Sequence, residues 1–167
     1  MGSLLATLTG WFTVWPPLVQ VGLLSCLPLV ELRLALPYGL LRFDLPAWEI
    51  ILTAWAGNLL SCTLVWLLLR YGVPRVRRHW GWFDRLCERV FTRTRQQSSR
   101  RMKRLGYLGL FLFIVVPLPG SGGWTGALIA YLFGVPLRDT VFILAAGLAG
   151  AALLVAGVTL GAVHLWG

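Results

Sequence analysis

Four long apolar regions alternate along the chain with short polar turns and one strongly basic segment. Two of these regions, residues 47–69 and 137–165, are continuous and long enough to cross a bilayer as helices. The other two, residues 16–43 and 106–134, have a similar length but are interrupted by prolines and glycines. This pattern contains no alternation typical of strands, and it predicts an all-α integral membrane protein.

Each interrupted region divides into two pieces of about 12 residues, or roughly 18 Å of helix, which reaches the middle of a bilayer. A break at that depth is tolerated only where protein or a wet cavity satisfies the backbone. We therefore expect residues 17–42 and 106–134 to be re-entrant helical hairpins, with full spans as the alternative. The prolines expected to break the hairpins are Pro28, Pro37, Pro117 and Pro119.

The two halves of the chain resemble each other at a shift of 90 residues. Residues 43–49 (FDLPAWE) align with residues 133–139 (FGVPLRD), with the proline and the acid in matching places. The same shift aligns Ala-Gly at residues 56–57 with Ala-Gly at residues 146–147. We interpret this as an internal repeat, in which each copy is a re-entrant hairpin followed by one transmembrane helix.

The chain is then a single membrane domain, residues 1–167, with four parts. These are an interfacial segment (1–15), a first repeat (16–70), a basic cytoplasmic segment (71–105) and a second repeat (106–167). Because basic loops stay in the cytoplasm, the hairpin model makes the repeats inverted and places both termini outside. Four complete spans would instead place both termini inside.

Composition agrees with a membrane protein, since 57% of the residues are hydrophobic and the mean hydropathy is +0.75. The net charge of +9 is concentrated, with 12 of the 15 basic residues between Arg70 and Arg104. Membrane segments on both sides favour a cytoplasmic loop over a nucleic-acid site. Within the loop, Trp82, Leu86 and Val90 recur at helical spacing and predict an amphipathic helix that contacts membrane lipids.

The sequence offers no recognisable catalytic or metal-binding set. Cys26, Cys62 and Cys87 form no CxxC pair and lie near no histidine, so neither a metal site nor a disulfide framework is expected. There is no serine–histidine–acid arrangement, no HExxH motif and no Walker phosphate loop. We expect a protein that is not an enzyme and that needs no cofactor.

Glu31 and Arg33 are the leading candidates for chemistry, because they lie inside an apolar region. Each would cost about 2.5–3.5 kcal/mol at the centre of a lipid-facing helix, so such residues usually face a cavity or each other. Glu31 is the candidate for proton or ion coupling, and Arg33 for substrate binding. The structural alternative is an ion pair that closes the hairpin. Asn58, in the middle of a span, is a further candidate for substrate binding or for helix packing.

The second candidate element is the loop at residues 117–123 (PLPGSGG), which precedes a helical stretch. Free backbone N–H groups at a helix start attract anions, and broken transporter helices use them for substrate. The glycines alternatively serve only a tight turn. The first-turn acids Glu49 and Asp139 are interpreted as helix capping. The candidate substrate-binding residues of this loop are Gly120, Ser121, Gly122, Gly123, Trp124 and Thr125.

Two motifs resemble those of a known family. Residues 28–39 (PLVELRLALPYG) resemble the P-x-x-E-x-R-x-x-x-P-x-G element of the putative small multidrug export proteins, and residues 117–127 (PLPGSGGWTGA) resemble that family's second element. Through this family the chain resembles the DedA (VTT-domain) superfamily. The resemblance covers roughly residues 17–160.

The resemblance implies a multi-pass protein of the prokaryotic inner membrane with two inverted repeats. DedA relatives are implicated in moving polyprenyl phosphate lipids and in proton-dependent resistance, and they place acids and arginines near their hairpins. Only Glu31 and Arg33 match that arrangement here, because the loop of the second hairpin has no charge.

We expect a small secondary transporter that exports a small or amphipathic solute with proton coupling. A flippase or scramblase for an anionic lipid is the first alternative, and a non-transporting membrane scaffold is the second. The expected partners are membrane lipids and a small-molecule or lipid substrate, without nucleic acid. A homodimer is compatible with the short repeats and with the Gly157-x-x-x-Gly161 spacing.

Overall fold

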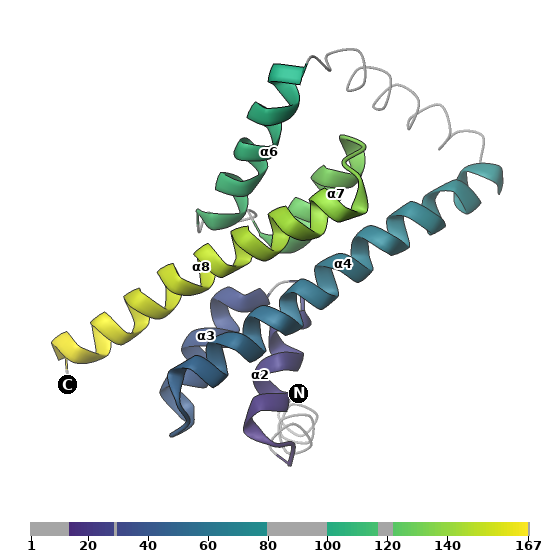
Figure 1. The fold of residues 1–167 in the computed structure, drawn as a ribbon. Coiled ribbons are helices and arrows are strands. Elements are labelled where there is room, and N and C mark those ends of the chain that lie inside the picture. The colour runs from purple at the N-terminus through teal and green to yellow at the C-terminus, as the bar shows by residue number, and fades with distance from the viewer. Residues whose placement is uncertain (1–13, 29, 80–99, 117–121, 167) are drawn as a thin grey trace. The chain divides into compact units, whose positions relative to one another are not determined.

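The computed structural model describes residues 14–28, 30–79, 100–116 and 122–166 (Figure 1). These residues form helices and contain no strand. The interfacial segment and the amphipathic helix, predicted at residues 1–15 and around Trp82, lie almost wholly outside the described residues. The helices are α2 (Pro17–Cys26), α3 (Glu31–Arg42), α4 (Ala47–His79), α6 (Arg100–Val115), α7 (Gly123–Leu132) and α8 (Leu137–Trp166).

Two of the helices are long and apolar enough to cross a membrane. They contain the candidate spans Ala47–Arg75 in α4 and Leu137–Leu165 in α8. The sequence predicted a first span ending at residue 69, but α4 continues to His79. Polar and basic residues end the apolar stretch without ending the helix, because a helix can leave the bilayer with its backbone bonds intact.

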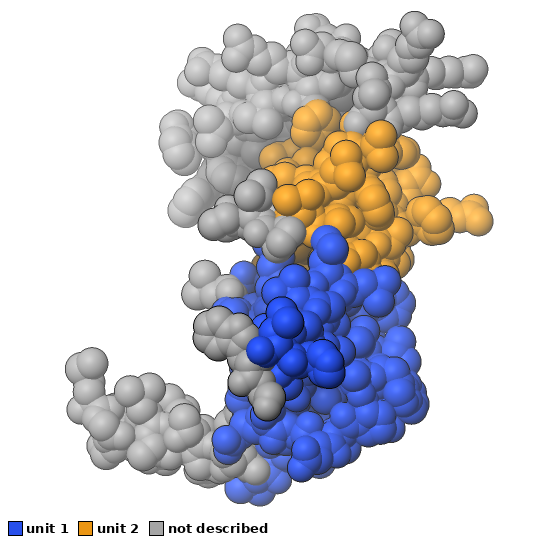
Figure 2. Space-filling view, turned by 90° about the vertical axis from the view of Figure 1, so that its left-hand side faces the viewer, with its two compact units in different colours: residues 1–58, 152–167 blue, residues 59–151 orange. Residues whose placement is uncertain are grey.

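The chain forms two compact units, which Figure 2 colours separately. Unit 1 comprises residues 1–58 and 152–167, and unit 2 comprises residues 59–151. Unit 1 therefore holds α2, α3, the start of α4 and the second half of α8, whereas unit 2 holds the rest of α4, α6, α7 and the first half of α8. The boundary divides each long helix between the two units.

In unit 1, α2 and α3 pack against each other on either side of a break in the chain. Pro16 and Pro17 start α2, where the fixed φ angle and missing N–H of proline are tolerated. The helix ends at Cys26, two residues before Pro28, where the sequence predicted a break. Apolar side chains of both helices, including Val21, Leu32 and Leu36, are fully buried.

The predicted break at Pro37 is wrong, because α3 continues through this residue. Pro37 has no N–H to donate to the carbonyl of Arg33, so the helix loses one bond at this point. Burial of the neighbouring Ala35, Leu36 and Gly39 offsets that loss and holds the segment helical.

A glycine in the long helix permits close packing in unit 1. A Cβ atom at Gly57 would lie 2.5 Å from Ser25 Oγ and 2.7 Å from the Gly22 carbonyl oxygen. Only a residue without a side chain therefore allows α2 to approach α4 at this level. The Cys26 thiol adds a hydrogen bond to the Gly57 carbonyl at 3.2 Å.

In unit 2, a glycine of α8 is packed against Ile114 of α6, as Gly57 of α4 is packed against α2 in unit 1. Ile114 is almost fully buried. A Cβ atom at Gly147 of α8 would lie 2.9 Å from Ile114 Cγ2. The Tyr107 hydroxyl also joins α6 to α8, because it donates to Asp139 Oδ2 at 3.1 Å. Helices α6 and α7 pack against each other on either side of the second break.

Candidate functional site

Glu31 lies at the break of the first hairpin, as the first residue of α3. Its side chain is buried, with 8% exposed. Its backbone has φ +46°, in the left-handed region that residues other than glycine seldom adopt. The N–H of Glu31 donates to the Leu27 carbonyl at 2.9 Å, which ties the two sides of the break together. The chain thus holds a carboxyl group inside the protein at a strained backbone position.

Arg33 follows in the first turn of α3 and is half-buried. It interacts electrostatically with Glu31, so the turn that begins α3 brings the acid and the base together. The sequence left open whether residues two apart would converge, because on a regular helix they point in different directions.

Two further polar side chains join α2 to α3 in the same unit. Gln20 is 4% exposed, and its amide Nε2 donates to the Trp15 carbonyl at 2.7 Å. Its Oε1 accepts a hydrogen bond from the Tyr38 hydroxyl at 3.1 Å. Sequence reasoning did not select either residue. An amide in an otherwise apolar helix is a signal that would have identified Gln20.

Asn58 and Ser25 are the most deeply buried polar residues of unit 1, each fully enclosed. The Ser25 hydroxyl is satisfied within α2, since it donates to the Gly22 carbonyl at 2.7 Å. Asn58 lies in α4 directly after Gly57, the glycine against which α2 packs. Its complete burial shows that Asn58 is enclosed by protein. A role in substrate binding stays a prediction.

The second predicted element is described only in part. Pro117, Pro119, Gly120 and Ser121 lie outside the described residues. Gly122 precedes α7 in an extended conformation, and its carbonyl accepts the N–H of Gly126 at 2.8 Å. Helix α7 begins at residue 123, as the sequence predicted to within one residue. The glycines at 122 and 123 are buried, whereas Trp124 and Thr125 are half-buried.

The candidate residues do not form one described site. Glu31, Arg33 and Asn58 belong to unit 1, and the start of α7 belongs to unit 2. The candidate site is therefore the first hairpin alone. It contains a buried carboxyl group, a neighbouring guanidinium group and a buried amide. Such a set can bind or release a proton and can pair with an anionic group.

No group of three His, Cys, Asp or Glu side chains within the described residues is placed to hold a metal ion.

Two helices long and apolar enough to cross a membrane, together with a buried acid at a helix break, are typical of a small helical membrane protein. The chain belongs to the family described as putative small multi-drug export protein, whose family model matches residues 31–154. The match begins at Glu31 and includes Arg33, Asn58 and the loop before α7. No curated protein matches the chain, and no solved structure matches it.

Proposed function

We propose that the protein is a small secondary transporter, not an enzyme, which exports a small or amphipathic solute in exchange for protons. The proposed location is a prokaryotic inner membrane, which the chain crosses several times. The observation that carries the proposal is Glu31, a buried carboxyl group at a break between two helices in a membrane protein. Membership of an export family supports the same class of function.

Glu31 suits a proton carrier because two opposing effects act on its charge. Burial favours the protonated form of a carboxyl group, whereas a nearby guanidinium group favours the charged form. Arg33 supplies that guanidinium. A substrate group that displaced Arg33 or bound to it would change this balance. Proton release and substrate binding would thereby be coupled at one place.

The order of the helices supports an internal repeat. In each half, two short helices separated by a break precede one long helix. Gly57 and Gly147, which are 90 residues apart, each allow the first short helix to approach the long one. Inverted repeats with broken helices are a common basis of alternating access in secondary transporters.

The test uses purified protein in liposomes with an imposed pH gradient. Ethidium serves as the amphipathic cation and 8-anilinonaphthalene-1-sulfonate as the amphipathic anion, and uptake is followed by fluorescence. Wild-type protein should accumulate one of the dyes only while the gradient lasts. Glu31→Gln should abolish gradient-driven accumulation, because the amide cannot carry the proton. Glu49→Gln is the matched control, since Glu49 lies in the first turn of α4 and should act only as a cap.

Two results would contradict the proposal. One is accumulation by Glu31→Gln at the wild-type rate. The other is equal loss of accumulation in Glu31→Gln and Glu49→Gln, which would indicate that removal of any acid disturbs the fold.

A lipid flippase or scramblase is the second candidate function. Arg33 is half-buried, and the next residue, Leu34, is 59% exposed, so a phosphate headgroup could lie at Arg33 while its chain stays in lipid. Mass spectrometry of co-purified lipids separates the candidates. Retention of a phosphorylated polyprenyl lipid by wild-type protein, and its loss in Arg33→Ala, would favour the flippase.

A further inference from the structure

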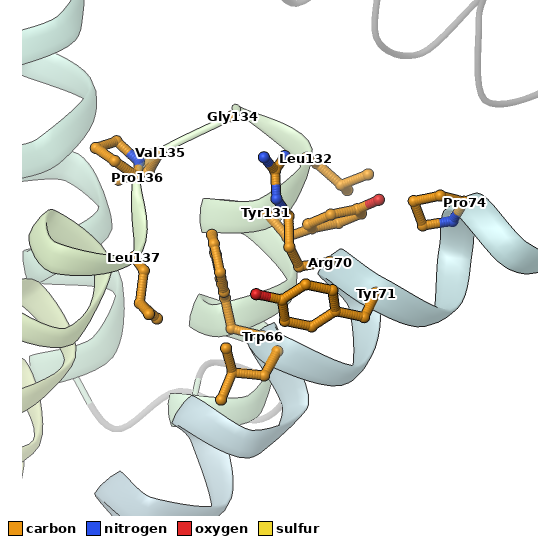
Figure 3. A pocket seen from close by; sticks show the side chains of 11 residues that line it. Trp66, Arg70, Tyr71, Pro74, Tyr131, Leu132, Gly134, Val135, Pro136 and Leu137 are labelled. Carbon is orange, nitrogen blue, oxygen red and sulfur yellow. The ribbon is translucent and has the colours of Figure 1, made fainter.

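Unit 2 contains a pocket that none of the candidate residues above lines. Its volume is about 680 Å³, which is large enough for a drug-sized molecule or a lipid headgroup. One wall is the last part of α4, and the other is the segment that ends α7 and begins α8 (Figure 3). The residues that the argument uses are Trp66, Arg70, Tyr71 and Tyr131.

Trp66 lines this pocket and carries a hydrogen-bond donor without a partner in the described part of the chain. The residue is 6% exposed, and its indole nitrogen is buried with no partner among the described residues. A buried N–H group without an acceptor is unfavourable, because it has lost the hydrogen bond that it would make to water. A ligand whose acceptor oxygen reached this nitrogen would restore the missing hydrogen bond. The donor therefore favours a ligand with a negatively charged or strongly polar oxygen.

Arg70 lies one helical turn beyond Trp66 on the same face of α4, since the two are four residues apart. Figure 3 shows its side chain leaving the helix beside Tyr71 and Tyr131. Arg70 is exposed, so its charge is available to a ligand. A guanidinium group pairs well with phosphate oxygens, and the tyrosine rings offer apolar walls.

The position along the chain indicates the source of the ligand. Arg70 lies five residues before the end of the candidate span Ala47–Arg75, next to the basic segment. Headgroups of anionic lipids lie at such a span end, and basic residues attract them. Tryptophan and tyrosine also gather at the membrane interface without binding any ligand. A belt residue, however, would keep its indole N–H toward water, whereas that of Trp66 is buried.

We propose that this pocket binds the phosphate headgroup of an anionic phospholipid. Arg70 pairs with the phosphate, the indole N–H of Trp66 donates to one of its oxygens, and Tyr71 and Tyr131 flank the apolar part of the lipid. The inference does not depend on the proposed transport function, because it concerns other residues in the other unit.

The test measures lipid binding to the full-length protein in detergent by native mass spectrometry. The probes are dioctanoyl phosphatidylglycerol, dioctanoyl phosphatidylcholine and inorganic phosphate. Of the three probes, wild-type protein should bind dioctanoyl phosphatidylglycerol most tightly, because only this lipid has a net negative charge as well as an apolar part. Arg70→Gln and Trp66→Phe should each raise the Kd for that lipid by about tenfold, as expected for loss of one hydrogen bond to a charged group.

Two control variants separate this site from general effects of charge and aromatic content. Arg138→Gln removes an exposed charge beside the pocket, and Trp48→Phe removes an exposed indole in unit 1. Neither residue lines the pocket, and neither change should alter the Kd. Arg70 is exposed, so Arg70→Gln should fold normally even if Trp66→Phe does not.

Three results would overturn the proposal. Equal Kd values for the two lipids would show that the negative charge is not recognised. Equal weakening by Arg70→Gln and Arg138→Gln would indicate binding by overall charge. Binding of inorganic phosphate as tightly as the lipid would indicate a soluble anion as the ligand.

Discussion

At the scale of single residues, the proposed function depends on polar side chains in buried positions. Among the described residues, Glu31 is both the buried acid and a residue with a left-handed backbone angle. The sequence identified Glu31 and Arg33, because charges inside an apolar region are conspicuous. The hydrogen bond between Gln20 and Tyr38 could not be predicted from the sequence, because it depends on how α2 packs on α3.

Pro37 gives a residue-scale prediction, because it interrupts the bonding of a helix that nevertheless continues. Pro37→Ala should raise the thermal unfolding midpoint in detergent, since alanine restores a donor to the Arg33 carbonyl. Proline in a helix interior costs about 3 kcal/mol relative to alanine, which sets the upper limit of the gain.

The control for this prediction is Pro17→Ala. Pro17 is the first residue of α2, where proline is well tolerated, so the change should leave the midpoint nearly unaltered. An unchanged or lower midpoint for Pro37→Ala would mean that the pyrrolidine ring stabilises α3 through packing.

At the scale of helices, the sequence indicated the first break and the start of α7, but not the continuation of α3 through Pro37 or the end of α4. Prolines and glycines within apolar sequence indicated the break near Pro28 and the start of α7. These residue types interrupt helical hydrogen bonding, so they mark breaks even where hydropathy is uniform. Hydropathy could not locate the end of α4 at His79, since charged residues continue a helix outside the bilayer as readily as apolar ones.

The pocket of unit 2 could not be predicted from the sequence. Its walls come from α4 and from a segment about 60 residues later in the chain, and one sequence carries no information on which segments meet. The four-residue spacing of Trp66 and Arg70 was the local signal. It was masked by the general preference of these residue types for the ends of membrane helices.

Helix packing in unit 1 gives a prediction at this scale. Gly57→Ala should lower the thermal unfolding midpoint, because its methyl group would collide with the backbone carbonyl of Gly22. Overpacking of this kind costs about 1–3 kcal/mol. Gly72→Ala is the matched control in the same helix, where a Cβ atom meets nothing within 4 Å. That change should preserve or raise the midpoint, since alanine favours helix over glycine.

If Gly57→Ala and Gly72→Ala shifted the midpoint equally, the close contact of α2 with α4 would not contribute to stability. The pair of variants therefore tests the packing contact separately from helix propensity.

At the scale of the whole molecule, the proposed function depends on how the two interrupted regions lie in the bilayer. Re-entrant hairpins would hold Glu31 near mid-membrane and make the two repeats inverted. If the two interrupted regions crossed the membrane completely, the chain would make four crossings and both termini would lie in the cytoplasm. The basic residues between the halves fix the cytoplasmic side in either case.

The most direct measurement is the location of the two termini relative to the basic segment. A fluorescent protein that matures only in the cytoplasm and an alkaline phosphatase active only outside would be fused in turn to each terminus. The hairpin account predicts phosphatase activity and no fluorescence at both ends. Fluorescence at both ends without phosphatase activity would contradict it, because the interrupted regions would then cross the membrane completely.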